Sequence, residues 1–164
     1  MIIIVCIDDR NGMMFHHRRQ SQDRVLLADL LRQCQKNKLY MNAYSHALFL
    51  KHDLFAKQAL STDIITAEDF FLQAGEEDFC FMETMADFLT AADKMPALMD
   101  QIRGLILYRW NRTYPADTHF SIDLTDGSWI LTSQEEFAGS SHERITRETY
   151  TKRLLPSHTE RRTD

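Results

Sequence analysis

The sequence has little of what marks the specialised classes of protein. Only 3 of its 164 residues are cysteines, and they are widely spaced, so they form neither a disulfide framework nor a C-x-x-C metal motif. No apolar run approaches the about 18 residues that cross a membrane. The opening run Met1–Ile7 is too short for the apolar core of a signal peptide. These absences predict a cytoplasmic protein without a membrane partner.

An excess of positive charge is also missing. The chain carries 19 lysines and arginines against 24 aspartates and glutamates, which gives a net charge of −5. Proteins that bind nucleic acid usually gather basic residues, because the phosphate backbone provides much of their affinity. The charge balance therefore argues against nucleic acid as a partner.

Familiar cofactor and metal motifs are absent as well. The sequence has no Walker-type G-x-x-x-x-G-K, no G-x-G-x-x-G and no H-E-x-x-H. The pair His16-His17 lacks the further ligands that a zinc site needs. We predict no metal centre.

What is present fits one α/β domain. A chain of this length can bury a core without disulfides or metals. Apolar β-branched runs alternate with segments of helical periodicity, which is typical of parallel βαβ units. We expect strands near 2–7, 39–41, 63–66, 78–83 and 105–110, and helices near 23–35, 45–50, 67–74, 85–91 and 96–101. The domain is predicted to span residues 1–155, followed by a polar, disordered tail at 156–164.

The C-terminal part is predicted to be antiparallel. Runs rich in β-formers lie at 119–124, from Trp129 onward and at 145–151, separated by turn residues. Leu105–Tyr108 is almost entirely apolar, which suits a strand covered on both faces. The loop Asn111–Thr118 leaves the end of this strand, where ligand sites are common.

The first predicted helix follows a basic segment. Ser21 is expected to cap this helix, with Asp23 in its first turn. Arg18 and Arg19 precede it in a predicted loop, which is either an anion contact or simply solvated. Arg109 and Arg112 are further candidates for an anion site.

Ser141 and His142 are adjacent, so a serine–histidine nucleophile has to be considered. Neighbours in sequence rarely face each other in a usable geometry. No G-x-S-x-G context surrounds the pair. We therefore predict that it forms a turn.

Several motifs resemble those of the dihydrofolate reductase family. The matching segments are Val5–Asp8 with Asn11–Met13, Lys38–Met41, Leu107–Trp110, Ala116–Phe120 (ADTHF), Trp129 and Ser133–Phe137. The resemblance implies an α/β fold with a mostly parallel central sheet, helices on both faces and an antiparallel C-terminal hairpin.

The resemblance also implies a pocket. In that family NADPH delivers hydride to a pterin, which is held by a buried carboxylate on the first helix and a threonine of the D-T-H-F motif. Asp23 and Thr118 would take these catalytic roles as a hydrogen-bonded pair. Burial would raise the pKa of the carboxyl group, so that it could exchange protons near neutral pH. Cys6 and Ile7 would offer the backbone of the first strand to the substrate ring.

The cofactor half of this pocket departs from the family pattern. Asn11, Gly12 and Ser45 match cofactor-binding positions. Asn42-Ala43, however, replaces a Gly-Arg pair, and Glu83-Thr84 replaces a Gly-Gly pair. Side chains and a negative charge at these places oppose the binding of a pyrophosphate. The resemblance thus implies NADPH as the cofactor, whereas these residues argue against its binding.

Two runs, R-R-Q-S-Q-D-R and Y-R-W-N-R, are also similar to those of short proteins that carry the name ribonuclease Z. That name implies a two-zinc site built from clustered histidines and aspartates, which the sequence lacks. Our first hypothesis is a protein that binds a small heterocyclic or nucleotide ligand between the first strand, the first helix and the DTHF loop. An NAD(P)H-dependent reductase of a pteridine-like substrate and a nuclease are the alternatives.

Overall fold

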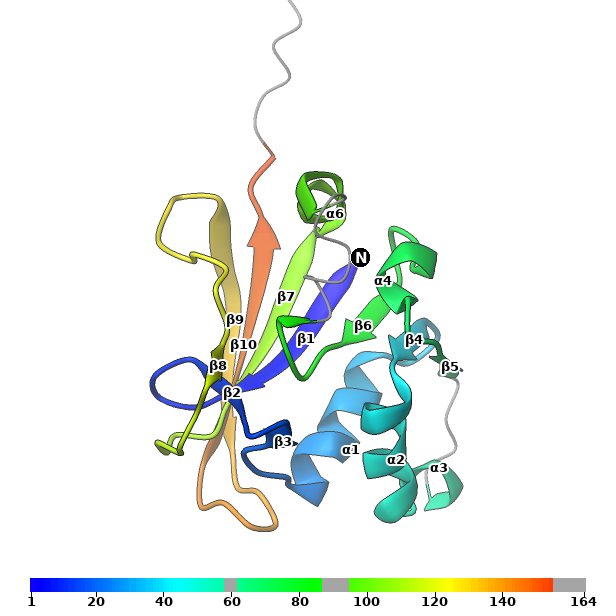
Figure 1. The fold of residues 1–164 in the computed structure, drawn as a ribbon, viewed down its shortest axis with the longest axis vertical. Helices are drawn as coiled ribbons and strands as arrows, with labels where there is room; N and C mark the ends of the chain where they lie inside the picture. Colours follow the sequence, from blue (N-terminus) through cyan, green and yellow to red (C-terminus); the bar gives the residue numbers. More distant parts are fainter. Residues whose placement is uncertain (58–61, 87–94, 155–164) are drawn as a thin grey trace, which may run out of the picture.

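The computed structural model describes residues 1–57, 62–86 and 95–154, and its main sheet is mixed as predicted (Figure 1). Its strands are β1 (Ile2–Ile7), β4 (Lys38–Met41), β5 (Asp63–Thr66), β6 (Phe79–Phe81), β7 (Gly104–Arg109), β9 (Trp129–Phe137) and β10 (Ile145–Lys152). They lie in the order β5-β4-β6-β1-β7-β10-β9. The first five of this order are parallel, whereas β10 is antiparallel to both β7 and β9.

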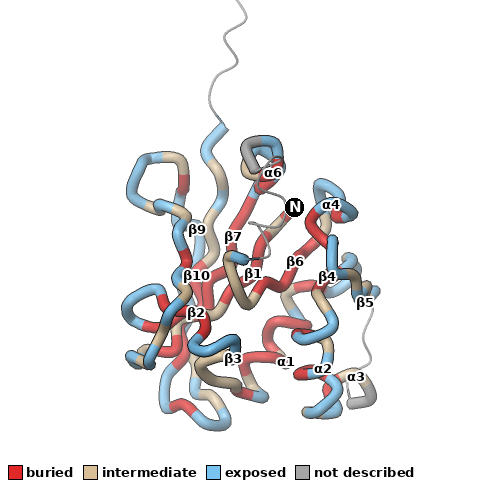
Figure 2. The backbone as a smooth tube through the Cα atoms, viewed as in Figure 1, coloured by how far each residue is buried: buried red, intermediate tan, exposed pale blue. Residues whose placement is uncertain are grey.

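Helices cover both faces of this sheet, which confirms the predicted layers. The helices are α1 (Arg24–Gln33), α2 (Ala43–Lys51), α3 (Leu54–Lys57), α4 (Phe70–Gln73) and α6 (Met95–Gln101) (Figure 1). Ile4 of β1 packs on the side of α1 and α2, while Ile3 and Val5 pack on the side of α4 and α6. The central strands are therefore buried on both faces (Figure 2), which explains their unbroken apolar sequences.

A second sheet forms where the sequence predicted a loop. Its strands are β2 (Gly12–Phe15), β3 (Arg18–Arg19) and β8 (Thr118–His119), in the order β3-β2-β8. The turn between β2 and β3 is His16-His17, with φ angles of 49° and 59°. Positive φ at both central residues is typical of a two-residue hairpin turn, but glycine or asparagine normally signals it. The hairpin was therefore not predictable from its turn residues.

Helix α1 begins at a different cap from the predicted one. Asp23, not Ser21, is the N-cap, and its carboxylate accepts hydrogen bonds from the N–H groups of Val25 and Leu26. Aspartate and serine cap helices about equally well, so residue type alone could not decide between them. The position of the cap is decided by the loop that packs against Asp23.

The predicted strand at 119–124 is much shorter in the structure. β8 ends at His119, and none of the residues 120–128 belongs to a strand. Asp123 and Asp126 accept hydrogen bonds from backbone N–H groups two residues further on. Such local turns compete with strand pairing and explain the difference.

The remaining helix predictions are met in part. The helix predicted at 67–74 is reduced to α4, and the helix predicted at 96–101 is α6. Most of the helix predicted at 85–91 and the tail at 156–164 lie outside the described residues. No helix in the described part of the chain is both long and apolar enough to cross a membrane.

A buried polar network joins α1 to the C-terminal strands. The Oδ2 atom of Asp29 accepts hydrogen bonds from the hydroxyl of Tyr108 at 2.7 Å and from Nη1 of Arg147 at 2.6 Å. Tyr108 is fully buried. Burial and the neighbouring carboxylate raise the pKa of this tyrosine, so it stays a hydrogen-bond donor. A buried ion pair of this kind is costly to disturb, because each charge has lost its water.

We expect the substitution Tyr108→Phe to lower the free energy of unfolding by about 1–3 kcal/mol, since it removes a donor from a buried carboxylate. The matched control is Tyr40→Phe, because the hydroxyl of Tyr40 makes no hydrogen bond to the described residues; we expect a change below about 0.5 kcal/mol. Urea unfolding followed by circular dichroism measures both. Equal effects of the two substitutions would contradict the role of the Asp29 network.

Candidate functional site

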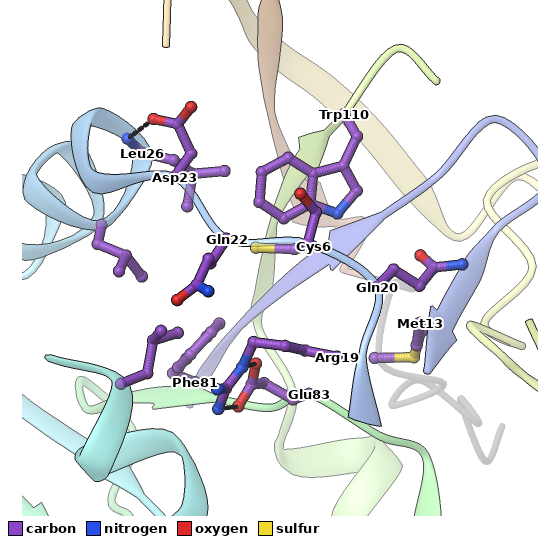
Figure 3. Close-up of a pocket in the computed structure, with 13 residues that line it drawn as sticks. Cys6, Met13, Arg19, Gln20, Gln22, Asp23, Leu26, Phe81, Glu83 and Trp110 are labelled. Carbon is purple, nitrogen blue, oxygen red and sulfur yellow. Dashed lines mark hydrogen bonds and ion pairs between the residues drawn. The ribbon is translucent and has the colours of Figure 1, made fainter. Parts of the chain in front are cut away.

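The region where the resemblance predicts a ligand contains two separate cavities. The first, between β1, α1 and β6, has a volume of about 20 Å³ (Figure 3). Its walls include Cys6, Leu26, Leu27, Phe81, Glu83 and Trp110. This volume holds about one water molecule. A heterocycle fits there only if side chains move.

An ion pair between Arg19 and Glu83 borders this cavity (Figure 3). Arg19 donates from Nε to Oε1 at 2.8 Å and from Nη2 to Oε2 at 3.0 Å, a two-pronged geometry. The hydroxyl of Ser45 donates to Oε2 of the same carboxylate at 2.8 Å. The guanidinium also lies 4.2 Å from the ring centre of Tyr44. The pair links β3 to the segment after β6 and, through Ser45, to α2, and Glu83 lines both cavities.

Two N–H groups at the N-terminus of α2 donate to the chain's own side chains. The N–H of Ala43 donates to the carboxylate of Glu68 at 3.2 Å, and the N–H of Ser45 donates to the side chain of Asn42 at 2.9 Å. Phosphates bind at a helix N-terminus through free N–H groups. Here Glu68 and Glu83 add negative charge instead. These residues do not fit the pyrophosphate of NADPH.

The second cavity lies between β2, β8 and the start of α2 and has a volume of about 350 Å³. Its walls include Met14, His17, Asn42, Tyr44, Asp117 and Thr118, and it shares Glu83 with the first cavity. The Oγ1 atom of Thr118 is buried and has no hydrogen-bond partner among the described residues. Leaving a buried hydroxyl unpaired costs about 1–3 kcal/mol. A ligand atom that pairs with Thr118 would recover this energy.

Asp23 does not pair with Thr118, contrary to the prediction. Its carboxylate is buried, with 0% of the side chain exposed. It accepts hydrogen bonds from the N–H groups of Val25, Leu26, Ser140 and Ser141 and contacts Nδ1 of His142 at 3.1 Å. Asp23 lines the small cavity together with Leu26 and Leu27, but its carboxylate is turned to these donors. Asp23 instead ties the loop between β9 and β10 to the start of α1.

The predicted rise in the pKa of Asp23 is also wrong. Burial alone would raise this pKa, but the N–H donors of Ser141 and Ser140 and the side chain of His142 outweigh it. They hold the pKa of Asp23 well below its usual range. The carboxylate therefore stays ionised near neutral pH and cannot store a proton there.

The other predicted binding residues have different surroundings. Cys6 lines the small cavity, whereas Ile7 packs in the core on the opposite face of the sheet. The carbonyl of Ile7 already accepts the N–H of Trp110 at 3.0 Å. Asn11 has a φ of 61°, and a Cβ on Gly12 would overlap neighbouring side chains. These two residues form the tight turn after β1.

The four arginines predicted to bind an anion are in two different situations. Arg19 and Arg109 are each paired with a glutamate at 2.8 Å, so their charge is already compensated. Arg18 is exposed on β3, and Arg112 is exposed in the loop after β7. Only the second pair is placed to meet an anion from solution.

His142 is the residue whose surroundings the sequence least revealed. Its side chain is 2% exposed, and its ring stacks on Trp110 with the ring centres 4.6 Å apart. Its Nε2 atom lies 3.1 Å from the hydroxyl of Ser21 and 2.9 Å from that of Tyr114. These partners are distant in sequence, so no local pattern could have identified them.

Comparisons with known proteins support the fold of the chain and nothing beyond it. No protein-family model matches the chain, and no curated protein sequence matches it. Many solved structures do match, among them dihydrofolate reductase from Enterococcus faecalis complexed with NADP(H) and RAB-propyl. The match has a TM-score of 0.57 and 13% identity and covers 93% of this chain and 96% of that one. The chain thus has a dihydrofolate reductase-like fold.

Asp23→Ala is expected to lower the free energy of unfolding by about 3–5 kcal/mol. It removes the N-cap of α1 and leaves several other buried donors without an acceptor. Asn42→Ala is the matched control, because Asn42 caps α2 through a single hydrogen bond, and we expect a loss of about 1 kcal/mol. Urea unfolding would contradict the assignment if both substitutions cost the same.

Because the pKa of Asp23 is lowered in the folded state, we expect the free energy of unfolding to decrease at acid pH. Since the folded state holds the proton less tightly, Asp23 contributes its full stability above its unfolded pKa of about 3.9. That contribution is lost as the pH falls below this value. Asp23→Asn should flatten the decline between about pH 5 and pH 2.5 in urea unfolding, whereas the exposed control Asp9→Asn should retain the wild-type slope. A wild-type slope in Asp23→Asn would refute the shift.

Proposed function

We propose that this protein binds a small nitrogen heterocycle in the cavity beside Thr118 and does so without NADPH. The observation that carries the proposal is Thr118, which lines a cavity of about 350 Å³ and whose buried hydroxyl lacks a partner among the described residues. Cavities of about 300–1,000 Å³ with a few convergent polar groups are typical of small-molecule sites. The proposal keeps the ligand class expected from the sequence. It places this ligand beside Thr118 of the DTHF motif and not against the first strand and the first helix.

The chemistry of this cavity favours a ligand rich in hydrogen-bond donors. Asp117 and Glu83 offer carboxylate oxygens, and Asn42 offers an amide. Arg19 compensates the charge of Glu83, while among the described residues the carboxylate of Asp117 receives only the N–H of His16, at 2.9 Å. The ring of Tyr44 provides a surface for stacking. A neutral or cationic heterocycle with amino groups suits these groups, whereas a polyphosphate does not.

Neither alternative function has comparable support. A reductase would need NADPH, whose pyrophosphate does not suit the negative charges of Glu68 and Glu83 beside the N-terminus of α2. We therefore derive no hydride-transfer step. A two-zinc nuclease would need clustered ligands, and within the described ranges no three His, Cys, Asp or Glu side chains gather to hold a metal. A cytoplasmic location stays a prediction.

Isothermal titration calorimetry with pterin, adenine and 2,4-diaminopyrimidine tests the proposal. At least one of these probes should bind saturably, and Thr118→Val should weaken its binding about tenfold, because the hydroxyl that pairs with it is lost. The matched control Thr113→Val changes an exposed threonine outside the cavity and should leave the affinity unchanged.

NADPH is titrated in the same experiment. We expect no saturable binding at millimolar concentration. Binding of NADPH at micromolar concentration would favour the reductase instead. If none of the heterocycles binds, or if Thr118→Val binds as the wild type does, the proposed site is wrong.

A further inference from the structure

Three side chains form a continuous line beside the small cavity. The carboxylate of Asp23 contacts Nδ1 of His142 at 3.1 Å, and Nε2 of the same ring lies 3.1 Å from the hydroxyl of Ser21. A carboxylate, an imidazole and a serine hydroxyl in this order are recognised as a nucleophilic triad by geometry and not by sequence position. Ser21 lines the small cavity and is half-buried.

The charge on Asp23 determines which nitrogen of His142 carries the proton. An ionised carboxylate accepts hydrogen bonds only, so Nδ1 must donate its hydrogen to Asp23. In the neutral ring Nε2 then carries the lone pair, and the hydroxyls of Ser21 and Tyr114 lie 3.1 and 2.9 Å from it. This is the tautomer that a general base needs in order to remove the proton of a serine.

The imidazole is also held in a fixed orientation. Its ring stacks on Trp110, and the hydroxyl of Tyr114 lies 2.9 Å from Nε2. A Cβ on Gly139 would overlap Asp23, so this glycine lets the loop between β9 and β10 approach the carboxylate. The rigid setting is what a catalytic base requires, since its position relative to the nucleophile must not vary.

We propose that Ser21 is an activated nucleophile that hydrolyses small carboxylic esters, with His142 as the general base and Asp23 as the positioning residue. An open groove of about 710 Å³ runs along the other side of His142, with Trp110, Asn111 and Arg112 in its walls. Ser21 itself lines the small cavity and not this groove, so an ester reaches its hydroxyl only after side chains around the small cavity move. This proposal is independent of the ligand site beside Thr118.

The reaction balances with water as the second reactant. The Ser21 oxygen attacks the ester carbonyl carbon while Nε2 of His142 takes the serine proton. The bond from this carbon to the alcohol oxygen then breaks, and His142 returns the proton to the leaving alcohol. Water attacks the acyl-serine in the same way, which releases the acid and restores Ser21.

Ser141 is the nearest competitor for the role of nucleophile, and the ring nitrogens separate the two serines. The hydroxyl of Ser141 lies 3.1 Å from Nδ1, the nitrogen whose hydrogen points to Asp23. That nitrogen cannot accept a proton from a serine. The adjacency of Ser141 and His142 in the sequence is therefore misleading, and Ser21 is the serine on the basic nitrogen.

Labelling of the full chain with a fluorophosphonate probe tests the proposal, because such probes modify activated serines covalently. Trypsin releases residues 20–24 as a peptide in which Ser21 is the only residue with a hydroxyl group, so mass spectrometry identifies its modification directly. We expect this peptide to carry the probe in the native protein and to remain unmodified in urea.

Two variants separate catalysis from structure. His142→Asn keeps an N–H group for Asp23 but removes the base, so we expect labelling at least about 100-fold slower. Ser133→Ala removes an exposed serine on β9 and should be labelled as fast as the wild type. Absence of label on native Ser21, label on Ser141 instead, or an unchanged rate in His142→Asn would each overturn the proposal.

Discussion

The carboxylate of Asp23 lies where the start of α1 meets the loop between β9 and β10. It accepts hydrogen bonds from both segments and from His142. Because the side chain is fully buried, none of these donors can turn to water without exposing the carboxylate. These hydrogen bonds keep Asp23 ionised. The ionised carboxylate in turn sets the tautomer of His142, whose Nε2 faces Ser21. The residue that joins the two segments and positions His142 is therefore the N-cap of α1 and not a residue on the face of this helix.

The ion pair of Arg19 and Glu83 is the second constraint on the region. It lies between a cavity that holds about one water molecule and a cavity large enough for a heterocycle. Its partner Ser45 lies in the first turn of α2. The sheet thus keeps the dihydrofolate reductase-like arrangement, while the chain's own carboxylates accept hydrogen bonds from two residues at the start of α2.

The sequence specified the sheet better than the site. β1 and β7 were predictable because strands buried on both faces must be apolar throughout. The β2–β3 hairpin was not, since His16-His17 gives no usual turn signal. The ADTHF motif led correctly to the fold, yet the pairing of Asp23 with Thr118 does not occur. A cap and a residue in the first turn of a helix are close in sequence but point in different directions.

His142 shows why the remainder of the site required coordinates. Its partners Ser21, Asp23 and Tyr114 come from two other segments, and their convergence depends on how a loop folds back onto a helix start. Residue types could suggest a serine and a histidine, but they suggested Ser141, the neighbour in sequence. Which nitrogen a serine meets is a property of tertiary structure alone.

The proposed function requires that a heterocycle binds beside Thr118 and that NADPH does not bind at the N-terminus of α2. Backbone amide chemical shifts in ¹⁵N–¹H correlation spectra measure both, with 2,4-diaminopyrimidine and NADPH added separately. The heterocycle should shift the amides of Tyr44, Asp117 and Thr118, whereas NADPH should leave those of Ala43 and Ser45 in place. Saturable shifts of Ala43 and Ser45 with NADPH would show that the proposed function is wrong.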